Sequence, residues 1–126
     1  MALALGSICG LAIVIVMNRA GMLAERSGLA VLLAAIAAFW PVFAIADGHD
    51  EILHLAVFAG FLALALAGFV RGALWLVAGL ALHGLWDAGL ALGRPPGPAF
   101  WPAFCAALDL AAAAALALLW RRGRLA

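Results

Sequence analysis

Five apolar runs of 16 to 22 residues, which we interpret as membrane-spanning helices, constrain this chain more than any other feature. A transmembrane helix needs about 20 mostly apolar residues. The runs cover residues 2–17, 28–46, 52–70, 73–92 and 99–120. The segments between them are short and carry most of the charges and prolines. The sequence therefore predicts an all-α fold, a polytopic transmembrane helical bundle of five spans that forms a single domain over residues 1–126.

The amino-acid composition argues against a soluble domain. Hydrophobic residues make up 70% of the chain and charged residues 10%, which leaves too little polar surface for a protein of this size in water. The formal net charge is +1, and no basic patch indicates a nucleic-acid partner. We expect the lipid bilayer as the main partner. A lipid-like small molecule and a second copy of the chain, in a homo-oligomer, are the other partners to consider.

The arginines predict how the five spans are oriented. Loops of a five-span protein alternate between two sides, and Arg94 stands alone on one of them. The other side holds Arg19, Arg26, Arg71, Arg121, Arg122 and Arg124. Because basic residues concentrate in cytoplasmic loops, we expect the amino terminus outside and the carboxyl terminus in the cytoplasm. A four-span arrangement would remove this asymmetry. The expected location is the cytoplasmic (inner) membrane of a bacterium.

Two local patterns predict how individual spans pack and bend. The first run lacks the basic amino-terminal region of a signal peptide, and Asn18 and Arg19 follow it in place of an A-x-A cleavage site, so we expect it to remain as a transmembrane helix. Its Gly6 and Gly10 form a small-residue notch that allows close packing on a neighbouring helix. Trp40 and Pro41 lie inside the second run. Proline removes a backbone hydrogen bond, so a kink is expected there.

The fourth run carries His83 and Asp87, four residues apart in an almost wholly apolar stretch. Residues at this spacing share one face of a helix. Exposing either side chain to lipid would raise the free energy of the protein by several kcal/mol. We therefore expect both side chains to point into the bundle, where other polar groups meet them.

Counting residues from the break at 94–98 identifies the groups at matching depth. Asp109 on the fifth run lies as far from this break as His83 does, and Cys105 matches Asp87. The third run begins with further polar groups, of which Asp47 and Asp50 are expected to act as helix caps and His49 as a loop residue. We expect one interior cavity, opening outward, lined by Glu51, His54, His83, Asp87, Cys105 and Asp109.

These residue types suit two kinds of enzyme chemistry on a lipid or isoprenoid. The candidate catalytic residues are His83, Asp87 and Asp109. Imidazole and carboxylates also bind divalent metals such as Zn²⁺, Fe or Mn²⁺, and the candidate ligands are Glu51, His54, His83, Asp87 and Asp109. Without a metal, a carboxylate-paired histidine could act as a general acid and base. No H-x-x-x-H or H-E-x-x-H motif is present, so a metal site would be assembled from separate helices.

Three alternatives use the same residues without enzymatic chemistry. His54 and His83, on neighbouring helices, could ligate a haem, although their depths differ by several residues. The polar groups could instead line a proton or ion pathway. A purely structural clamp is the third alternative, with Asp109 accepting a hydrogen bond from His83. Trp86 and Trp40 would then pack between helices, whereas in a binding site they would form its walls.

The second half of the chain resembles a small bacterial family of integral membrane proteins of unknown function. The motif residues are His83, Trp86 and Asp87 (H-x-x-W-D), followed after a proline-rich break by Pro102, Cys105 and Asp109. The acidic Glu51 before the third span is a further point of similarity. This resemblance implies only that these positions form a unit, because the family has no activity to transfer.

Overall fold

The computed structural model describes residues 1–126 as a bundle of six α-helices. They are α1 (Ala2–Arg19), α2 (Arg26–Ala37), α3 (Phe39–Asp47), α4 (Glu51–Arg71), α5 (Ala73–Leu90) and α6 (Trp101–Arg121). Together α2 and α3 form one bent span, so five segments are long and apolar enough to cross a membrane. The predicted all-α architecture with five potential spans is confirmed.

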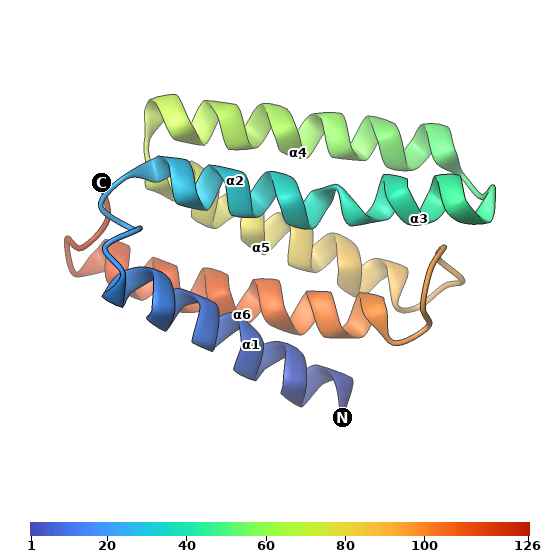
Figure 1. Cartoon of the computed structure of the whole chain (residues 1–126), viewed down its shortest axis with the longest axis horizontal. Helices are drawn as coiled ribbons and strands as arrows, with labels where there is room; N and C mark the ends of the chain where they lie inside the picture. Colours follow the sequence, from blue (N-terminus) through green and yellow to red (C-terminus); the bar gives the residue numbers. More distant parts are fainter.

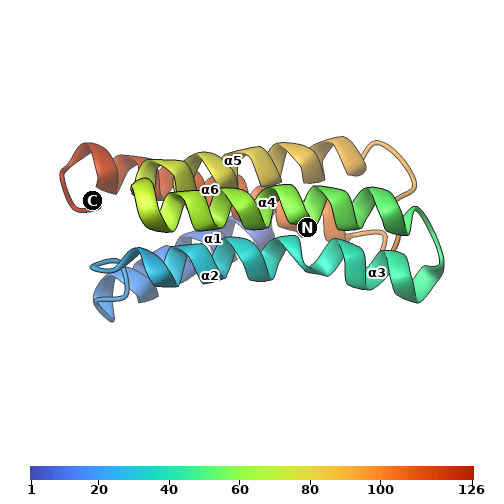
Figure 2. The ribbon, with the colours of Figure 1, turned by 90° about the horizontal axis from the view of Figure 1, so that it is seen from above.

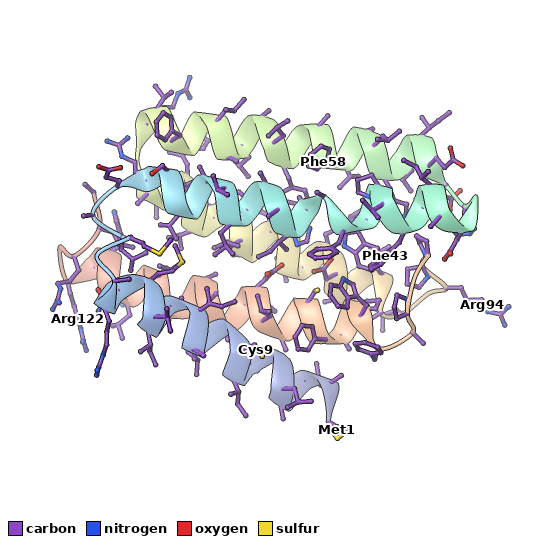
Figure 3. The ribbon with its side chains drawn as sticks, viewed as in Figure 1. Met1, Cys9, Phe43, Phe58, Arg94 and Arg122 are labelled. Carbon is purple, nitrogen blue, oxygen red and sulfur yellow. The ribbon has the colours of Figure 1, made fainter.

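The helices run along the long axis of the molecule, and their connections gather at its two ends (Figure 1). Seen from above, α4 lies between the α2–α3 span and α5 (Figure 2). Six of the seven arginines lie at or beyond the helix ends on one side, which we call the arginine-rich end. The opposite end, the acidic end, holds the α3–α4 and α5–α6 connections. Arg122 and Arg94 mark these two ends (Figure 3).

The second span bends where the proline predicts it. The backbone of Ala38 separates α2 from α3, three residues before Pro41. Since proline has no N–H, the carbonyl of Ala37 loses the donor that would continue the helix. Trp40 lies in the first turn after this break and is 2% exposed. The bend therefore lies beside a tryptophan that is directed into the bundle.

Close packing of α1 on α6 depends on two glycines. A Cβ atom at Gly6 would collide with the carbonyl oxygen of Phe104, and one at Gly10 with that of Leu108. Backbone atoms cannot move aside as a flexible side chain can. The expected small-residue notch is thus present, and it faces the last span, which α1 crosses obliquely (Figure 1).

The interior is divided into an apolar half and a polar half. Buried aliphatic residues such as Leu29, Leu33, Leu76, Leu80 and Leu116 fill the half near the arginine-rich end. The buried histidines and aspartates lie beyond them, toward the acidic end. The polar half is the part of the fold that can carry chemistry.

Polar contacts at both ends connect segments that are far apart in the sequence. Arg26 donates from Nη1 to the carbonyls of Phe69 and Val70, at 3.1 and 3.0 Å, and so caps the end of α4. At the acidic end the N–H of Gly97 donates to Oδ2 of Asp47 at 2.7 Å. Asp47 was expected to cap a helix start, but it ends α3 and ties the two connections together instead. Asp50 occupies the N-cap position of α4 without a side-chain capping bond.

Candidate functional site

His83, Asp87 and Asp109 meet in the polar half of the bundle. His83 Nδ1 lies 2.6 Å from Oδ2 of Asp109 and 3.3 Å from Oδ2 of Asp87. The exposed fractions of the three residues are 1%, 0% and 0%. One possible ligand atom from each lies within 4.8 Å of the others. We call these three residues the His/Asp/Asp cluster.

Gly84 allows the two helices to approach closely enough for this contact. A Cβ atom at this position would lie 2.9 Å from Cγ of Leu110 and 3.1 Å from Cβ of Asp109. Both distances are shorter than ordinary van der Waals contact between carbon atoms. The glycine beside His83 therefore determines how near α5 can come to Asp109.

A third segment reaches the cluster through Trp40. Its Nε1 donates a hydrogen bond of 2.7 Å to Oδ1 of Asp87. Trp40 was expected only to line or pack the site, and its role as a hydrogen-bond donor was missed. The sequence carries only a general signal for it, because the indole N–H of a buried tryptophan usually finds a hydrogen-bond partner.

The cluster holds more hydrogen-bonding capacity than its members use. Nδ1 of His83 can donate at most one hydrogen, and Asp109 is the nearer acceptor. Buried atoms without a hydrogen-bond partner are therefore left, namely Nε2 of His83, Oδ2 of Asp87 and Oδ1 of Asp109. Unpartnered buried groups of this kind cost about 1–3 kcal/mol each. Their presence in one place indicates a site that takes up a further polar species.

The charges of the cluster are also unbalanced. Two ionised carboxylates are opposed by one imidazole, which supplies a single positive charge at most. No arginine lies in this half of the interior, because all seven are at helix ends or in connections. A cation or additional protons would complete the balance.

His54 is buried near the cluster but does not belong to it. Its ring stacks on Trp40, with centroids 5.9 Å apart, and meets Trp86 edge-on at 6.3 Å. Nδ1 of His54 has no hydrogen-bond partner. His83 itself is covered by the ring of Phe61, edge-on at 4.8 Å. Aromatic side chains therefore cover the rings of both histidines.

Two expectations about the extent of the site are wrong. Glu51 is exposed at the start of α4, whereas His54 in the same turn is buried, so the Glu51 side chain is directed away from the packed side of that turn. The expected outward opening is also missing, since Asp87 and Asp109 are 0% exposed. Phe43, labelled in Figure 3, packs edge-on with Trp101 at 5.6 Å. Cys105 is buried as expected, but outside the cluster.

Comparisons with protein-family models, with curated proteins and with solved structures find no match for this chain. The functional argument consequently rests on the geometry of the His/Asp/Asp cluster and its surroundings.

Proposed function

We propose that His83, Asp87 and Asp109 bind one divalent metal ion, such as Zn²⁺, Fe²⁺ or Mn²⁺, in an enzyme that acts on a lipid or isoprenoid within the membrane. One observation carries this proposal: three ligand atoms from two helices lie within 4.8 Å of one another in a fully buried setting. Three protein ligands with a free coordination position are typical of catalytic metal sites, whereas structural zinc sites use four.

The charges of the cluster favour a bound metal ion over a cluster made of the three side chains alone. Burial removes the hydration of each carboxylate. This loss destabilises the charged group by several kcal/mol unless an opposite charge lies close to it. A divalent cation would neutralise Asp87 and Asp109 together, while the His83 imidazole would bind as a neutral ligand. The ion would also take up the unpartnered carboxylate oxygens of Asp87 and Asp109, and Nδ1 of His83, the ring nitrogen that faces both carboxylates, would be its third ligand.

The chain supplies support around this site. Trp40 holds Oδ1 of Asp87 by its 2.7 Å hydrogen bond and so leaves the other oxygen free to bind. Such supporting hydrogen bonds orient ligands and tune metal affinity. A bound ion would supply a Lewis acid that polarises a substrate oxygen. Glu51 has no part in this proposal, and His54 is a neighbour rather than a ligand.

A metal-free site is the second candidate, and the 2.6 Å contact between His83 and Asp109 favours it. The pair could move a proton to and from an apolar substrate, or act only as an interhelical clamp. Haem binding has no comparable support. The two imidazoles that would ligate the iron are packed against Trp40, Trp86 and Phe61.

Metal analysis of the purified protein tests the proposal. After loading with Zn²⁺, Fe²⁺ or Mn²⁺ in turn, the wild type should retain a stoichiometric amount of one of these metals. Asp87→Asn and Asp109→Asn keep the side-chain shape but remove the charge, and both should lose the metal. Asp47→Asn is the matched control, because that carboxylate lies at the acidic end. A wild-type protein that retains no metal under any loading condition would contradict the proposed metal site, and the metal-free site would then be the remaining candidate.

We also propose that the arginine-rich end faces the cytoplasm of a bacterium and that the protein lies in its inner membrane. The support is the six-to-one division of arginines between the two ends together with the preference of basic residues for cytoplasmic loops. A reporter fused after Arg124 should behave as cytoplasmic, and one inserted at Gly93 as external. The reverse pattern would overturn this orientation.

A further inference from the structure

An apolar groove runs between α4 and α5 beside the His/Asp/Asp cluster. It has a volume of about 480 Å³, and six of its seven lining residues are hydrophobic. The lining comes from residues 57–64 of α4 and 82–86 of α5. These stretches belong to the interior of two potential spans, so the groove lies at the level of hydrocarbon rather than of water. Its α5 wall is within one turn of His83.

Two aromatic residues connect the groove to the polar interior. Phe61 lines the groove, and its ring also contacts the imidazole of His83 at 4.8 Å. Nε2 of that imidazole has no hydrogen-bond partner. Trp86 lines the groove as well, and its buried Nε1 is likewise an unpartnered donor. The groove thus has an apolar wall, and two unpartnered polar atoms are buried directly behind that wall.

The rim of the groove favours a hydrocarbon chain over another helix. Leu82 and Leu85 are 53% and 60% exposed, and they continue into the lipid-facing surface of α5. Helices that associate in membranes use small residues at the contact, as Gly6 and Gly10 do in this protein. Bulky leucines at the rim would hold a helix of about 10 Å diameter away. A single chain is narrow enough to lie between them.

Gly60 enlarges the groove on the α4 side. A Cβ atom at this position would meet nothing within 4 Å, so the glycine is not required for packing against another part of the protein. The space it leaves faces the groove that it lines. A larger side chain would fit there without disturbing the helix, and it would fill the groove.

We propose that this groove binds one hydrocarbon chain of a membrane lipid and directs the polar end of that lipid to His83, with Phe61 as the gate between them. The inference rests on the proposed function, because it names the substrate class of the same site. A change in the Phe61 side-chain rotamer would connect the groove to Nε2 of His83. The substrate would then enter sideways from the bilayer, which agrees with the complete burial of Asp87 and Asp109.

Photocrosslinking tests the groove directly. Palmitic acid with a diazirine on its chain would be added to the protein in nanodiscs, and the adducts would be mapped by mass spectrometry. Saturable labelling, competed by unlabelled palmitic acid, is expected on the groove walls. A prenyl alcohol with the same diazirine distinguishes the two chain types by the amount of labelling. Labelling that is not saturable, or that falls on other faces of the bundle and not on the groove walls, would overturn the proposal.

Gly60→Leu and Ala59→Leu form a matched pair for this experiment. Leucine at position 60 should fill the groove and lower saturable labelling roughly tenfold, a change of about 1.4 kcal/mol. Position 59 is also exposed but is not part of the lining, so Ala59→Leu should label like the wild type. Equal thermal stability of the two variants shows that each folds. Equal labelling of the two would exclude the groove as the binding site.

Metal content separates this inference from the proposed function. Gly60→Leu should keep the metal of the wild type, because it does not touch the His/Asp/Asp cluster. Metal retention without saturable labelling of the groove would overturn the substrate route and leave the metal site standing. Saturable labelling in a protein that never binds metal would instead overturn the proposed metal site and leave a chain-binding groove.

Discussion

His83 and Asp109 are 26 residues apart in the sequence, and their side chains meet at 2.6 Å between Nδ1 and Oδ2. The contact joins α5 to α6 at a depth where neither group can reach water. Interhelical hydrogen bonds in membranes contribute only about 0.6 kcal/mol on average. Asp109 nevertheless depends on His83, because without the imidazole its carboxylate would be buried with no hydrogen-bond partner, whereas His83 would still face Oδ2 of Asp87 at 3.3 Å.

The dependence predicts an order of stability among variants of this pair. His83→Ala leaves Asp109 without a partner and should destabilise the protein by about 3–5 kcal/mol. The double variant His83→Leu/Asp109→Leu removes both polar groups, so it should be more stable than His83→Ala. Thermal or denaturant unfolding in detergent measures the difference. Both variants should lose any bound metal.

The same variants distinguish a working site from a clamp. If the wild type binds metal and the double variant does not, the cluster has a role beyond holding α5 and α6 together. Three results together would identify the cluster as a clamp only. The double variant would be fully stable, the wild type would take up no metal, and cells would tolerate the double substitution.

Trp40 should be needed for the position of Asp87. Trp40→Phe keeps an aromatic ring but removes the donor to Oδ1 of Asp87. The loss of this bond should cost about 1–3 kcal/mol of stability, and metal affinity should fall about 10–100-fold. Trp120→Phe is the control, because Trp120 is 40% exposed on α6 and makes no side-chain hydrogen bond. Similar metal affinity for the two variants would contradict a supporting role for Trp40.

The sequence predicts the outline of the site because its depth follows from helix geometry. The spacing of His83 and Asp87 fixes their common face, and the short break before α6 brings Asp109 to the same level. The scarcity of polar side chains in the spans left few other partners for them. These relationships depend on the regular geometry of single helices, so they follow from the spacing of residues in the sequence.

What the sequence did not predict depends on how helices rotate and where they end. Glu51 is separated from His54 by less than one turn, yet it is exposed while His54 is buried. Both residues lie in the first turn of α4, so which of them is buried depends on how that helix is rotated against its neighbours. The hydrogen bond from Trp40 and the ring of Phe61 on His83 likewise depend on how α3 and α4 are rotated against α5.

Gly84 should control the distance between α5 and α6 at the cluster. In Gly84→Ala the new Cβ would lie 2.9 Å from Leu110 and 3.1 Å from Asp109, so the helices would separate slightly and the His83–Asp109 bond would lengthen. We expect a loss of about 1–3 kcal/mol in stability and weaker metal binding. Gly89→Ala on the same helix is the control, since a Cβ there meets nothing within 4 Å. Equal metal binding by both variants would show that close approach at Gly84 does not matter.

The contact between α1 and α6 should depend on Gly10 in a way that leaves the cluster intact. A Cβ at Gly10 would collide with the backbone carbonyl of Leu108, which cannot turn away, so Gly10→Ala must displace α1 from α6. The expected loss of stability is about 1–3 kcal/mol. Metal content should stay at the wild-type level, because the cluster is built from α5 and α6 and supported from α3. Gly60→Ala, where the added methyl group has open space, should leave both properties unchanged. A Gly10→Ala protein that is as stable as Gly60→Ala would mean that α1 is not held by this notch.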